Sequence, residues 1–580
     1  MREQRKFGLA ILALALISTA IIWAVGLGEA TEEPDVAGQL ERDALYSYIK
    51  LLDKVAFDIN QRYVDSVDVK EMIYSGIKGM VQTLDPFSTL QDVEAHDRLM
   101  EMTEGKYEGL GMTISERDNV ITVISPIEGT PAYRMGLRAG DQILKIDGKS
   151  TQGMSTEDAS KMMRGRAGTS VTLTIKREGA SEPLEYEVER AVIELTSVPY
   201  YGMMNGGIGY VRLSKFSKDS GKELKDAIED LKKQGLKGMI LDLRSNGGGL
   251  LDQAVETSNL FLDQGKLIVY TEGRTQFRTD RDATVEPVFS VSDGPLAVLV
   301  NEGTASASEI VSGAIQDWDR GVIIGNTTFG KGLVQQIIPE RNETYLKLTV
   351  AKYYIPSGRC IQKPERAVRQ PLAQEEEETQ PADMEGKARS DTLVQTDKEV
   401  FYTKGGRKVY GGGGVVPDIE IPPEEMQPLE MNLLRQSMFF SFAVSYIAEH
   451  PNVSKDFEVD QQVLQEFKQY LKEKKFTYKS VLELQLEPLK EKIAKAENPE
   501  MFSGAIAQLE GAIEKDKEDD FDENLDQIKE SLRGAILSNK YGEKAYYEEV
   551  LLKTDPYVLK AHRVLTDENE YMGMLKQKEG

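Results

Sequence analysis

The sequence predicts a multidomain α+β protein. Its 580 residues exceed the roughly 250 to 300 residues at which a single hydrophobic core stops growing. The pattern of apolar residues changes along the chain from helical spacing to short strands, then to alternating strands and helices, and finally to helices again. Hydrophobic residues make up 40% of the chain and charged residues 29%, which is typical of folded globular proteins.

Residues 1–30 form the first predicted segment, a signal peptide or a membrane anchor. Three basic residues precede an uncharged apolar run from Phe7 to Leu27, and this arrangement serves either purpose. Small residues permit cleavage after Ala30, and the run is also long enough to span a bilayer, so both alternatives stay open. By the positive-inside rule, everything that follows lies outside the cytoplasm. We therefore expect an exported protein.

Residues 40–100 are predicted to form an N-terminal helical region. Two stretches repeat apolar residues at helical spacing, and the dipeptide Asp85-Pro86 ends the second, because proline disfavours helical geometry in the residue before it. The repeated positions are Leu45, Tyr48, Ile49, Leu52 and Val55 in the first stretch and Ile73, Ile77, Met80, Val81 and Leu84 in the second.

Residues 101–190 are predicted to form a compact β-rich domain, and residues 191–422 an α/β domain. The β-rich domain has short strands at Val120–Ile124, Gln142–Ile146 and Val171–Ile175. The α/β domain has strands at Ile208–Leu213 and Gly238–Leu243 and a helix at Lys222–Lys233. Residues 364–398, rich in Glu, Gln, Pro and Ala, are predicted to be a solvated insertion. Residues 423–580 are predicted to be a charged helical extension, with one buried face marked by Val463, Leu464, Phe467, Tyr470 and Leu471.

Composition excludes several classes of function. The 71 Lys and Arg residues against 96 Asp and Glu give a formal charge of −25, which repels nucleic acid. Cys360 is the single cysteine, so no intramolecular disulfide forms. Only His96, His450 and His562 are present, which nearly excludes a Cys/His zinc site. None of them lies near a glycine-rich turn or a serine-rich helix start, so a hydrolase would need a base other than histidine.

A serine at a predicted helix start is the first candidate for chemistry. Ser306 lies where an apolar strand turns into the helix Ile310–Asp317. Free backbone N–H groups and the positive end of the helix dipole would stabilise an oxyanion there. The alternative is a structural role, because Ser306-Ala-Ser-Glu309 also matches a helix capping box.

A lysine between two glycines is the second candidate. Lys331 and Gln335 are four residues apart in the predicted strand Phe329–Gln335, and an even offset places both side chains on one face. A lysine acts as a general base only when neutral, so burial must lower its pKa by about three units, or roughly 4 kcal/mol. A neutral amide such as Gln335 could orient the amine without restoring its proton. An exposed lysine on an edge strand is the alternative.

Two glycine-rich segments are candidates for binding through backbone amides. The predicted strand at Leu241 ends in the glycines of residues 247–249, and consecutive glycines let N–H groups approach a ligand as an oxyanion hole requires. The segment Tyr107–Ile114 joins a glycine turn to an apolar strand whose edge could pair with an extended peptide. A plain turn and a plain hairpin are the respective alternatives.

Together these segments resemble the carboxyl-terminal processing peptidases, also called tail-specific proteases. The resemblance covers roughly Leu45 to Pro422. Residues 85–88, Asp-Pro-Phe-Ser, are similar to the motif that precedes the PDZ domain in that family, and residues 125–132 and 136–141 are similar to the PDZ core. The Ser-Ala-Ser-Glu and Phe-Gly-Lys-Gly-x-Val-Gln segments are similar to its catalytic motifs. The resemblance implies a PDZ-like domain at 101–190 and a crotonase- or ClpP-like Ser–Lys protease core at 191–422.

The resemblance also implies roles for individual residues. Ser306 would be the nucleophile of a serine endopeptidase, Lys331 its general base and Gln335 the group that orients the lysine. The amides of Ala307 and Gly248 would form the oxyanion hole. The loop that binds a substrate carboxylate would comprise Gly109, Leu110, Gly111 and Met112.

Two departures from the family pattern stand out. Thr304 replaces a serine, which is chemically mild, and Gly247 replaces a usual proline, which loosens the turn. The insertion and the helical extension look similar to extensions in envelope-bound members from Bacteroidetes-like bacteria.

The resulting expectation is a periplasmic protease, secreted or anchored in the bacterial envelope, that needs no cofactor or metal. It would cut exported proteins near a free C-terminus, and an activating adaptor protein is a candidate partner. One alternative is a non-catalytic scaffold that binds protein C-termini. Another is a crotonase-type enzyme acting on thioesters, against which export and the lack of an adenine-binding signature argue.

Overall fold

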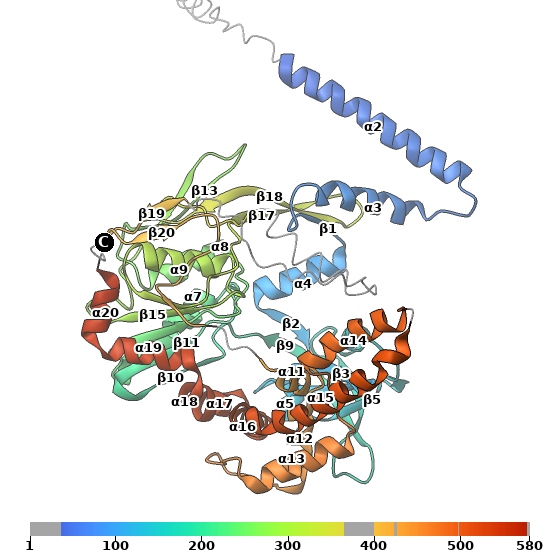
Figure 1. Cartoon of the computed structure of the whole chain (residues 1–580). Helices are drawn as coiled ribbons and strands as arrows, with labels where there is room; N and C mark the ends of the chain where they lie inside the picture. Colours follow the sequence, from blue (N-terminus) through green and yellow to red (C-terminus); the bar gives the residue numbers. More distant parts are fainter. Residues whose placement is uncertain (1–35, 365–398, 423–425, 497, 577–580) are drawn as a thin grey trace, which may run out of the picture. The chain divides into compact units, whose positions relative to one another are not determined.

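A computed structural model describes residues 36–364, 399–422, 426–496 and 498–576 (Figure 1). The chain divides into two compact units, residues 1–83 and 84–580. The predicted signal peptide or anchor and all but the first residue of the predicted insertion fall outside the described residues. Within the described residues, no helix combines the length and the apolar character that crossing a bilayer requires.

The first unit contains the two helices predicted from apolar periodicity. They are α2 (Val36–Arg62) and α3 (Val69–Gln82), and the carboxylate of Asp68 caps α3 by accepting the N–H of Glu71 at 3.0 Å. Leu45 and Leu52 on α2 stay 59% and 49% exposed. Both helices predicted from apolar periodicity are thus present.

The second unit begins with β1 (Thr89–Gln91) and α4 (Val93–Glu104), which lead into the β-rich domain. An antiparallel sheet runs in the order β3-β4-β5-β7-β8, with β6 paired to β5, and β2 pairs separately with β9. Its strands are β2 (Lys106–Gly109), β3 (Met112–Arg117), β4 (Val120–Pro126), β5 (Gln142–Ile146), β6 (Lys149–Ser150), β7 (Ser170–Lys176), β8 (Leu184–Glu189) and β9 (Ala191–Glu194), with helices α5 (Pro131–Arg134) and α6 (Thr156–Met163). Ile121, Val123 and Ile143 are fully buried in its core. The three strands predicted here are confirmed.

A six-stranded, mostly parallel sheet forms the centre of the α/β domain. The strand order is β10-β11-β12-β15-β16-β21, and only the β10–β11 pair is antiparallel. The strands are β10 (Tyr200–Met203), β11 (Ile208–Arg212), β12 (Gly238–Asp242), β15 (Leu296–Val300), β16 (Val322–Gly325) and β21 (Ile419–Glu420). Strands β12 and β15 are buried along their whole length, as expected for a sheet covered on both faces.

Helices from distant parts of the chain cover the two faces of this sheet. Helices α7 (Ser220–Lys233), α8 (Leu251–Asn259) and α9 (Ala307–Asp317) share one core cluster with it. Helices α19 (Pro556–Thr566) and α20 (Glu568–Leu575), drawn in red in Figure 1, share the other, where Val558, Ala561 and Val564 pack with Ile240 and Leu299. The end of the predicted helical extension is thus part of the α/β core.

A second sheet contains the strand that follows the predicted lysine segment. It joins β1, β18 (Tyr345–Tyr354), β13 (Leu267–Glu272) and β14 (Thr279–Asp282), and β17 (Leu333–Pro339) pairs with β18. The strand predicted at Phe329–Gln335 begins only at Leu333, and its register shifts between Val334 and Gln335. Backbone hydrogen bonds of Phe329 to Thr304 and of Tyr353 to Gly332 replace strand pairing there. Lys331 therefore lies in a loop, which corrects the predicted strand boundary.

The remaining described elements are one hairpin and the helices of the extension. The hairpin pairs β19 (Val400–Tyr402) with β20 (Lys408–Tyr410), and the extension contains α11 (Pro428–Arg435), α12 (Met438–Glu449), α13 (Gln461–Glu473), α14 (Val481–Ala494), α15 (Ser503–Glu523), α16 (Leu525–Tyr541), α17 (Glu543–Tyr546) and α18 (Leu552–Thr554). On α13, Val463, Leu464, Phe467 and Leu471 are buried and Tyr470 packs at their edge. The predicted buried face is confirmed.

Truncating a side chain between the sheet and α19 should destabilise the α/β domain. Ile240 is fully buried in the cluster shared with α19, so we expect Ile240→Ala to lower the free energy of unfolding by about 2–5 kcal/mol. Leu482→Ala is the control, because Leu482 is 46% exposed, and it should change that free energy by less than about 0.5 kcal/mol. Urea unfolding measures both, and equal effects would contradict the packing.

Candidate active site

The three candidate catalytic segments follow adjacent parallel strands of the central sheet. The glycine segment follows β12, the segment with Ser306 follows β15, and the loop with Lys331 follows β16. The carboxyl ends of parallel strands lie at one edge of a sheet, where α/β proteins place their ligands. The fold therefore gathers at one edge three segments that are well separated in the sequence.

Ser306 is held in an unusual backbone conformation at the start of α9. Its φ of 56° and ψ of −115° lie in a region that residues with a side chain rarely adopt, and such strain clusters at functional sites. The N–H of Glu309 donates to the backbone oxygen of Ser306 at 2.8 Å. Main-chain atoms thus satisfy this orphan donor of the helix.

Glu309 connects the serine segment to the lysine segment. One carboxylate oxygen accepts the N–H of Ser306 at 2.8 Å and the N–H of Lys331 at 2.9 Å, and the other accepts the N–H of Gly330 at 2.7 Å. The side chain is fully buried, and burial raises the pKa of Glu309, although Thr328 and these three amides oppose the rise. Each of these contacts is lost if the carboxylate is removed.

Tyr353 makes a second connection between the same two segments. Its ring is buried against α9 in the main core cluster. Its hydroxyl contacts two carbonyl oxygens, that of Ser306 at 3.1 Å and that of Lys331. Glu309 therefore binds the backbone N–H groups of Ser306 and Lys331, and Tyr353 contacts their carbonyl oxygens. Both backbones are held in place in this way.

The amine of Lys331 lies in a partly buried, mostly uncharged setting. Its Nζ donates to Gln335 Oε1 at 3.1 Å and lies 4.9 Å from the centre of the Phe87 ring. Gln335 Nε2 in turn donates to the backbone oxygen of Phe87 at 2.7 Å. Burial and the positive charge of Lys347 lower the pKa of Lys331 to about 8, although Glu309 and Asp85 oppose the shift. The predicted contact between amine and amide is present, although Lys331 precedes the strand.

The serine hydroxyl and the lysine amine are not joined directly. Across the ranges that the structure describes, no hydrogen bond links Ser306 Oγ to Lys331 Nζ. Catalytic hydrogen bonds are often long in proteins without substrate and shorten when one binds. The structure thus brings the two backbones together, but the serine hydroxyl and the lysine amine form no hydrogen bond with each other.

The two predicted oxyanion donors lie on either side of Ser306. Gly248 packs so closely that an added Cβ would come within 2.8 Å of Ser306 Cβ and 2.9 Å of the nitrogen of Ala307. With a φ of 94°, this position requires glycine. The N–H of Gly248 donates to Asn246 Oδ1 at 2.9 Å. Ala307 is the first residue of α9, where backbone N–H groups have no partner within the helix.

The predicted carboxylate loop connects β2 to β3 in the β-rich domain. Leu110 and Gly111 are buried, and Gly111 has a φ of 79°. Burial raises the pKa of the Tyr107 hydroxyl, while Arg164 and the amides of Gly111 and Met112 lower it. The amides that favour a phenolate oxygen at this place would also favour a carboxylate.

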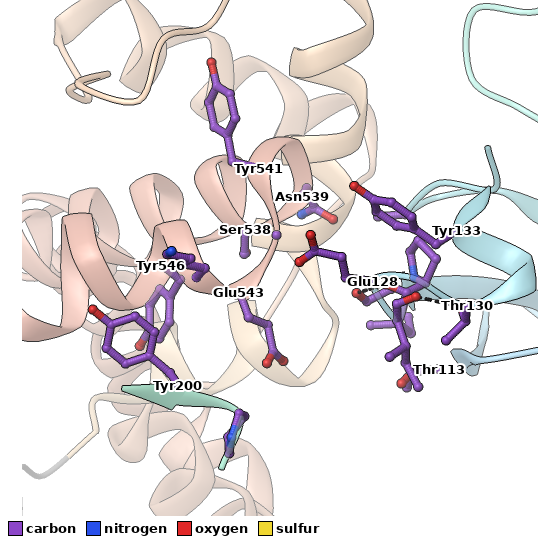
Figure 2. Close-up of a pocket in the computed structure, with 18 of the residues that line it drawn as sticks. Thr113, Glu128, Thr130, Tyr133, Tyr200, Ser538, Asn539, Tyr541, Glu543 and Tyr546 are labelled. Atoms are coloured by element: carbon purple, nitrogen blue, oxygen red, sulfur yellow. Dashed lines mark hydrogen bonds between the residues drawn. The ribbon is translucent and has the colours of Figure 1, made fainter. Parts of the chain in front are cut away.

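The second unit contains one cavity between the β-rich domain and the extension and another beside Phe87. Figure 2 shows the larger, with a volume of about 2880 Å³, where Glu128 and Tyr133 of the β-rich domain face Asn539 and Glu543 of the extension. Neither Ser306 nor Lys331 lines it. The smaller, of about 750 Å³, is lined by Phe87 together with Leu333, Thr349 and Cys360. Because Phe87 contacts the Lys331 amine, only the smaller cavity adjoins the candidate site.

No metal site emerges from the part of the chain with described positions, where no cluster of three or more His, Cys, Asp or Glu side chains could hold an ion. The histidines contact other parts of the molecule. His96 stacks on Tyr345, His450 on Tyr446, and His562 contacts the backbone oxygen of Asn205.

Sequence reasoning missed several residues of this site. Glu309 was considered only as part of a cap, and Tyr353, Phe87 and Lys347 were not considered at all as site residues. A buried tyrosine or a second lysine on a strand carries no local signal, because its role depends on a pairing such as Ile337 with Lys347. Phe87 belongs to the segment 85–88, which the sequence marks as a helix end and as similar to the motif before the PDZ domain, with no sign of a contact to the lysine.

Family models match three parts of the chain. "Peptidase family S41" matches residues 207–368, "PDZ domain" matches residues 122–177, and "Probable PDZ-protease, C-terminal helical domain" matches residues 429–565. The first of these contains all of the candidate catalytic residues.

Curated relatives extend the similarity. The carboxy-terminal-processing protease of Bartonella bacilliformis is 43% identical over 54% of this chain and 73% of its own length. The carboxy-terminal processing protease CtpA of Bacillus subtilis is 36% identical over 63% of this chain and 76% of its own length. Among solved structures, the photosystem II D1 C-terminal processing protease is 27% identical over 64% of this chain and 86% of that chain, with a TM-score of 0.34.

We expect the Lys331 amine to titrate near pH 8, and Lys347→Met to raise its pKa, because the charge of Lys347 disfavours a second ammonium nearby. The pH dependence of acetylation at Lys331, followed by mass spectrometry, measures this because only the neutral amine reacts. Lys352→Met is a matched control, since Lys352 is an exposed residue of the same strand. An unchanged pKa in Lys347→Met would contradict the assigned cause.

Proposed function

The chain belongs to the carboxy-terminal processing proteases of peptidase family S41, PDZ-containing serine endopeptidases that cleave near C-termini, and we propose that Ser306 and Lys331 form its catalytic dyad. The observation that carries this proposal is the shared buried carboxylate of Glu309, which binds the backbone amides of both residues. A depressed lysine pKa of about 8 supports it, because a base must be neutral at the working pH.

In this proposal Lys331 acts first as a base and then as an acid. The neutral amine takes the proton of the Ser306 hydroxyl as Oγ attacks the substrate carbonyl carbon. The ammonium then gives that proton to the leaving amine as the peptide bond breaks, and water hydrolyses the ester of Ser306 in the reverse sequence. Gln335 holds the amine in place through the contact at 3.1 Å.

The negative oxygen of the tetrahedral intermediate would bind the amides of Ala307 and Gly248. The close packing of Gly248 on Ser306 supports its assignment, and the first turn of α9 offers the amide of Ala307. Because the Gly248 amide now donates to Asn246 and the dyad is unpaired, we infer that substrate binding completes the site. Closure of this kind is common in enzymes that form their catalytic geometry on binding.

The PDZ domain binds peptide substrates through their C-termini, and we propose that the loop of Gly109, Leu110, Gly111 and Met112 holds the terminal carboxylate. Tyr107 supports this, because the amides of Gly111 and Met112 oppose the rise that burial causes in the pKa of its hydroxyl. The edge of β3, which begins at Met112, would pair with the residues upstream of that carboxylate.

The wider organisation of the protein is also a proposal. We propose a helical region at 40–100, a PDZ domain at 101–190, a protease core at 191–422 and an extension at 423–580. Residues 1–30 would direct the chain to the periplasm, either as a cleaved signal peptide or as an anchor. An activating adaptor protein would be one of its partners.

Replacing either member of the dyad should abolish proteolysis. We expect Ser306→Ala and Lys331→Ala to retain about a thousandth or less of the parent rate on an unfolded protein with a free apolar tail. Lys233→Ala, which removes an exposed lysine of α7, should retain full activity. For the parent, kcat/KM should rise with pH through about 8 as Lys331 loses its proton. Equal cleavage by Ser306→Ala would refute the dyad, and tail binding without cleavage by the parent would favour the scaffold alternative.

Tail capture can be tested in the Ser306→Ala protein without turnover. A peptide with a free C-terminal carboxylate should bind about tenfold more tightly than its amide, the worth of a charge-assisted hydrogen bond. Gly111→Ala should remove this preference, because a Cβ there would lie 2.3 Å from Thr130 and deform the loop. Gly148→Ala is the control, since Gly148 has a similar φ of 76° in open space. Calorimetric titration measures both, and equal binding of acid and amide would exclude carboxylate recognition.

A further inference from the structure

The first turn of helix α19 contacts the starts of two catalytic segments, and we propose that Asp555 and Tyr557 are positioning residues for the peptidase reaction. They would act through Arg244 and Asn326, and the inference rests on the proposed dyad and oxyanion hole. It gives the C-terminal extension a role in catalysis at the core itself.

Asp555 uses its two carboxylate oxygens for two different tasks. One oxygen caps α19 by accepting the N–H groups of Tyr557 at 2.9 Å and Val558 at 3.0 Å. The other accepts Nη1 of Arg244 at 2.8 Å. The cap fixes the position of the carboxylate on the helix, so the second oxygen presents a fixed acceptor to the core.

Arg244 connects the fixed carboxylate of Asp555 to the segment that contains Gly248. It follows the end of β12 by two residues and precedes Gly248 by four. Its Nη2 donates to Asp242 Oδ2 at 2.6 Å, and its guanidinium lies 4.9 Å from the centre of the Tyr557 ring. The side chain is 14% exposed, so these partners restrict it on several sides.

We expect the pairing of Arg244 with Asp242 to persist when Asp555 is replaced. Burial raises the pKa of Asp242, but Arg244 and Arg212 lower it by more than burial raises it. The pKa therefore lies below its ordinary value, and the carboxylate stays charged. Tyr210 also donates to Asp242 at 2.8 Å. Removing the charge of Asp555 should therefore loosen Arg244 on one side and leave the buried network intact.

Tyr557 makes the corresponding contact with the lysine segment. Its hydroxyl donates to Asn326 Oδ1 at 2.6 Å. Asn326 directly follows β16 and begins the loop that leads to Lys331. Its Nδ2 donates to the backbone oxygen of Ile421 at 2.7 Å, and its N–H to that of Val300 at 3.1 Å. One helical turn of the extension thus supports both the oxyanion side and the base side of the site.

Such support matters because catalysis depends on small displacements. A shift of about 1 Å in a catalytic group can cost roughly a hundredfold in rate. The loops after β12 and β16 begin where regular strand pairing ends, at Asp242 and Gly325. Side-chain contacts near the starts of these loops therefore add to the hydrogen bonds that hold Gly248 and Lys331.

The test is steady-state hydrolysis by the full chain carrying Asp555→Asn, Asp555→Glu or Tyr557→Phe. Asparagine can still cap α19 but lacks the charge that binds Arg244. We expect Asp555→Asn to lower kcat about tenfold with little change in KM. The affinity of a peptide boronate, whose serine adduct places an oxygen in the oxyanion hole, should fall in parallel. Asp555→Glu should recover part of the loss, and Tyr557→Phe should lower kcat in the same direction.

Asp567→Asn is the matched control. Asp567 caps α20 in the same way, accepting N–H groups of Asn569 and Glu570 at 3.0 Å, and its carboxylate has no recorded contact with the catalytic segments among the described residues. Because asparagine can also cap α20, this variant should keep its helix cap and leave kcat and boronate affinity unchanged.

The outcomes separate this inference from the proposed function. Hydrolysis by the parent that both Ser306→Ala and Lys331→Ala abolish supports the dyad in the same assay. Given that result, an unchanged kcat in Asp555→Asn would overturn the positioning role. So would a loss of kcat in Asp567→Asn of the same size, because general destabilisation would then explain both variants.

Discussion

A single buried carboxylate joins two of the three candidate catalytic segments of this protein. Glu309 accepts backbone N–H groups from Ser306, Gly330 and Lys331, so the start of α9 and the loop after β16 cannot move independently while it stays in place. Burying a charge is costly unless hydrogen bonds compensate it, and the Thr328 hydroxyl adds a further bond. The geometry of the serine and the lysine depends on this one side chain more than on any direct contact between them.

Much of the fold could be predicted from the sequence, because apolar periodicity reports local structure. Strand β5 was predicted with its observed bounds, and the buried face of α13 was recognised. The strand at Phe329 was placed too early, since loop residues there use hydrogen bonds to Thr304 and Gly332 that have no sequence signature. Ser306, Lys331 and Gln335 could be named from motifs, whereas Tyr353 enters the site only through tertiary packing.

The C-terminal extension shows the same limit of sequence reasoning. Its helical character was readable, but the sequence did not reveal that α19 and α20 cover the central sheet. A helix with an apolar stripe needs a partner surface, and nothing local tells whether that surface is another helix or a distant sheet. The extension therefore divides in its packing: α12, α13 and α16 pack around their own core, whereas α19 belongs to the domain that contains the candidate site.

The position of α19 in the chain has a consequence for biosynthesis. The sheet face that it covers is made of strands between Tyr200 and Ile324, but the residues of its cover begin only at Pro556. Domains fold as units when their residues are available. The domain can therefore fold completely only after the residues of α19 have been synthesised, and until then the apolar face that carries Ile240 and Leu299 has no cover.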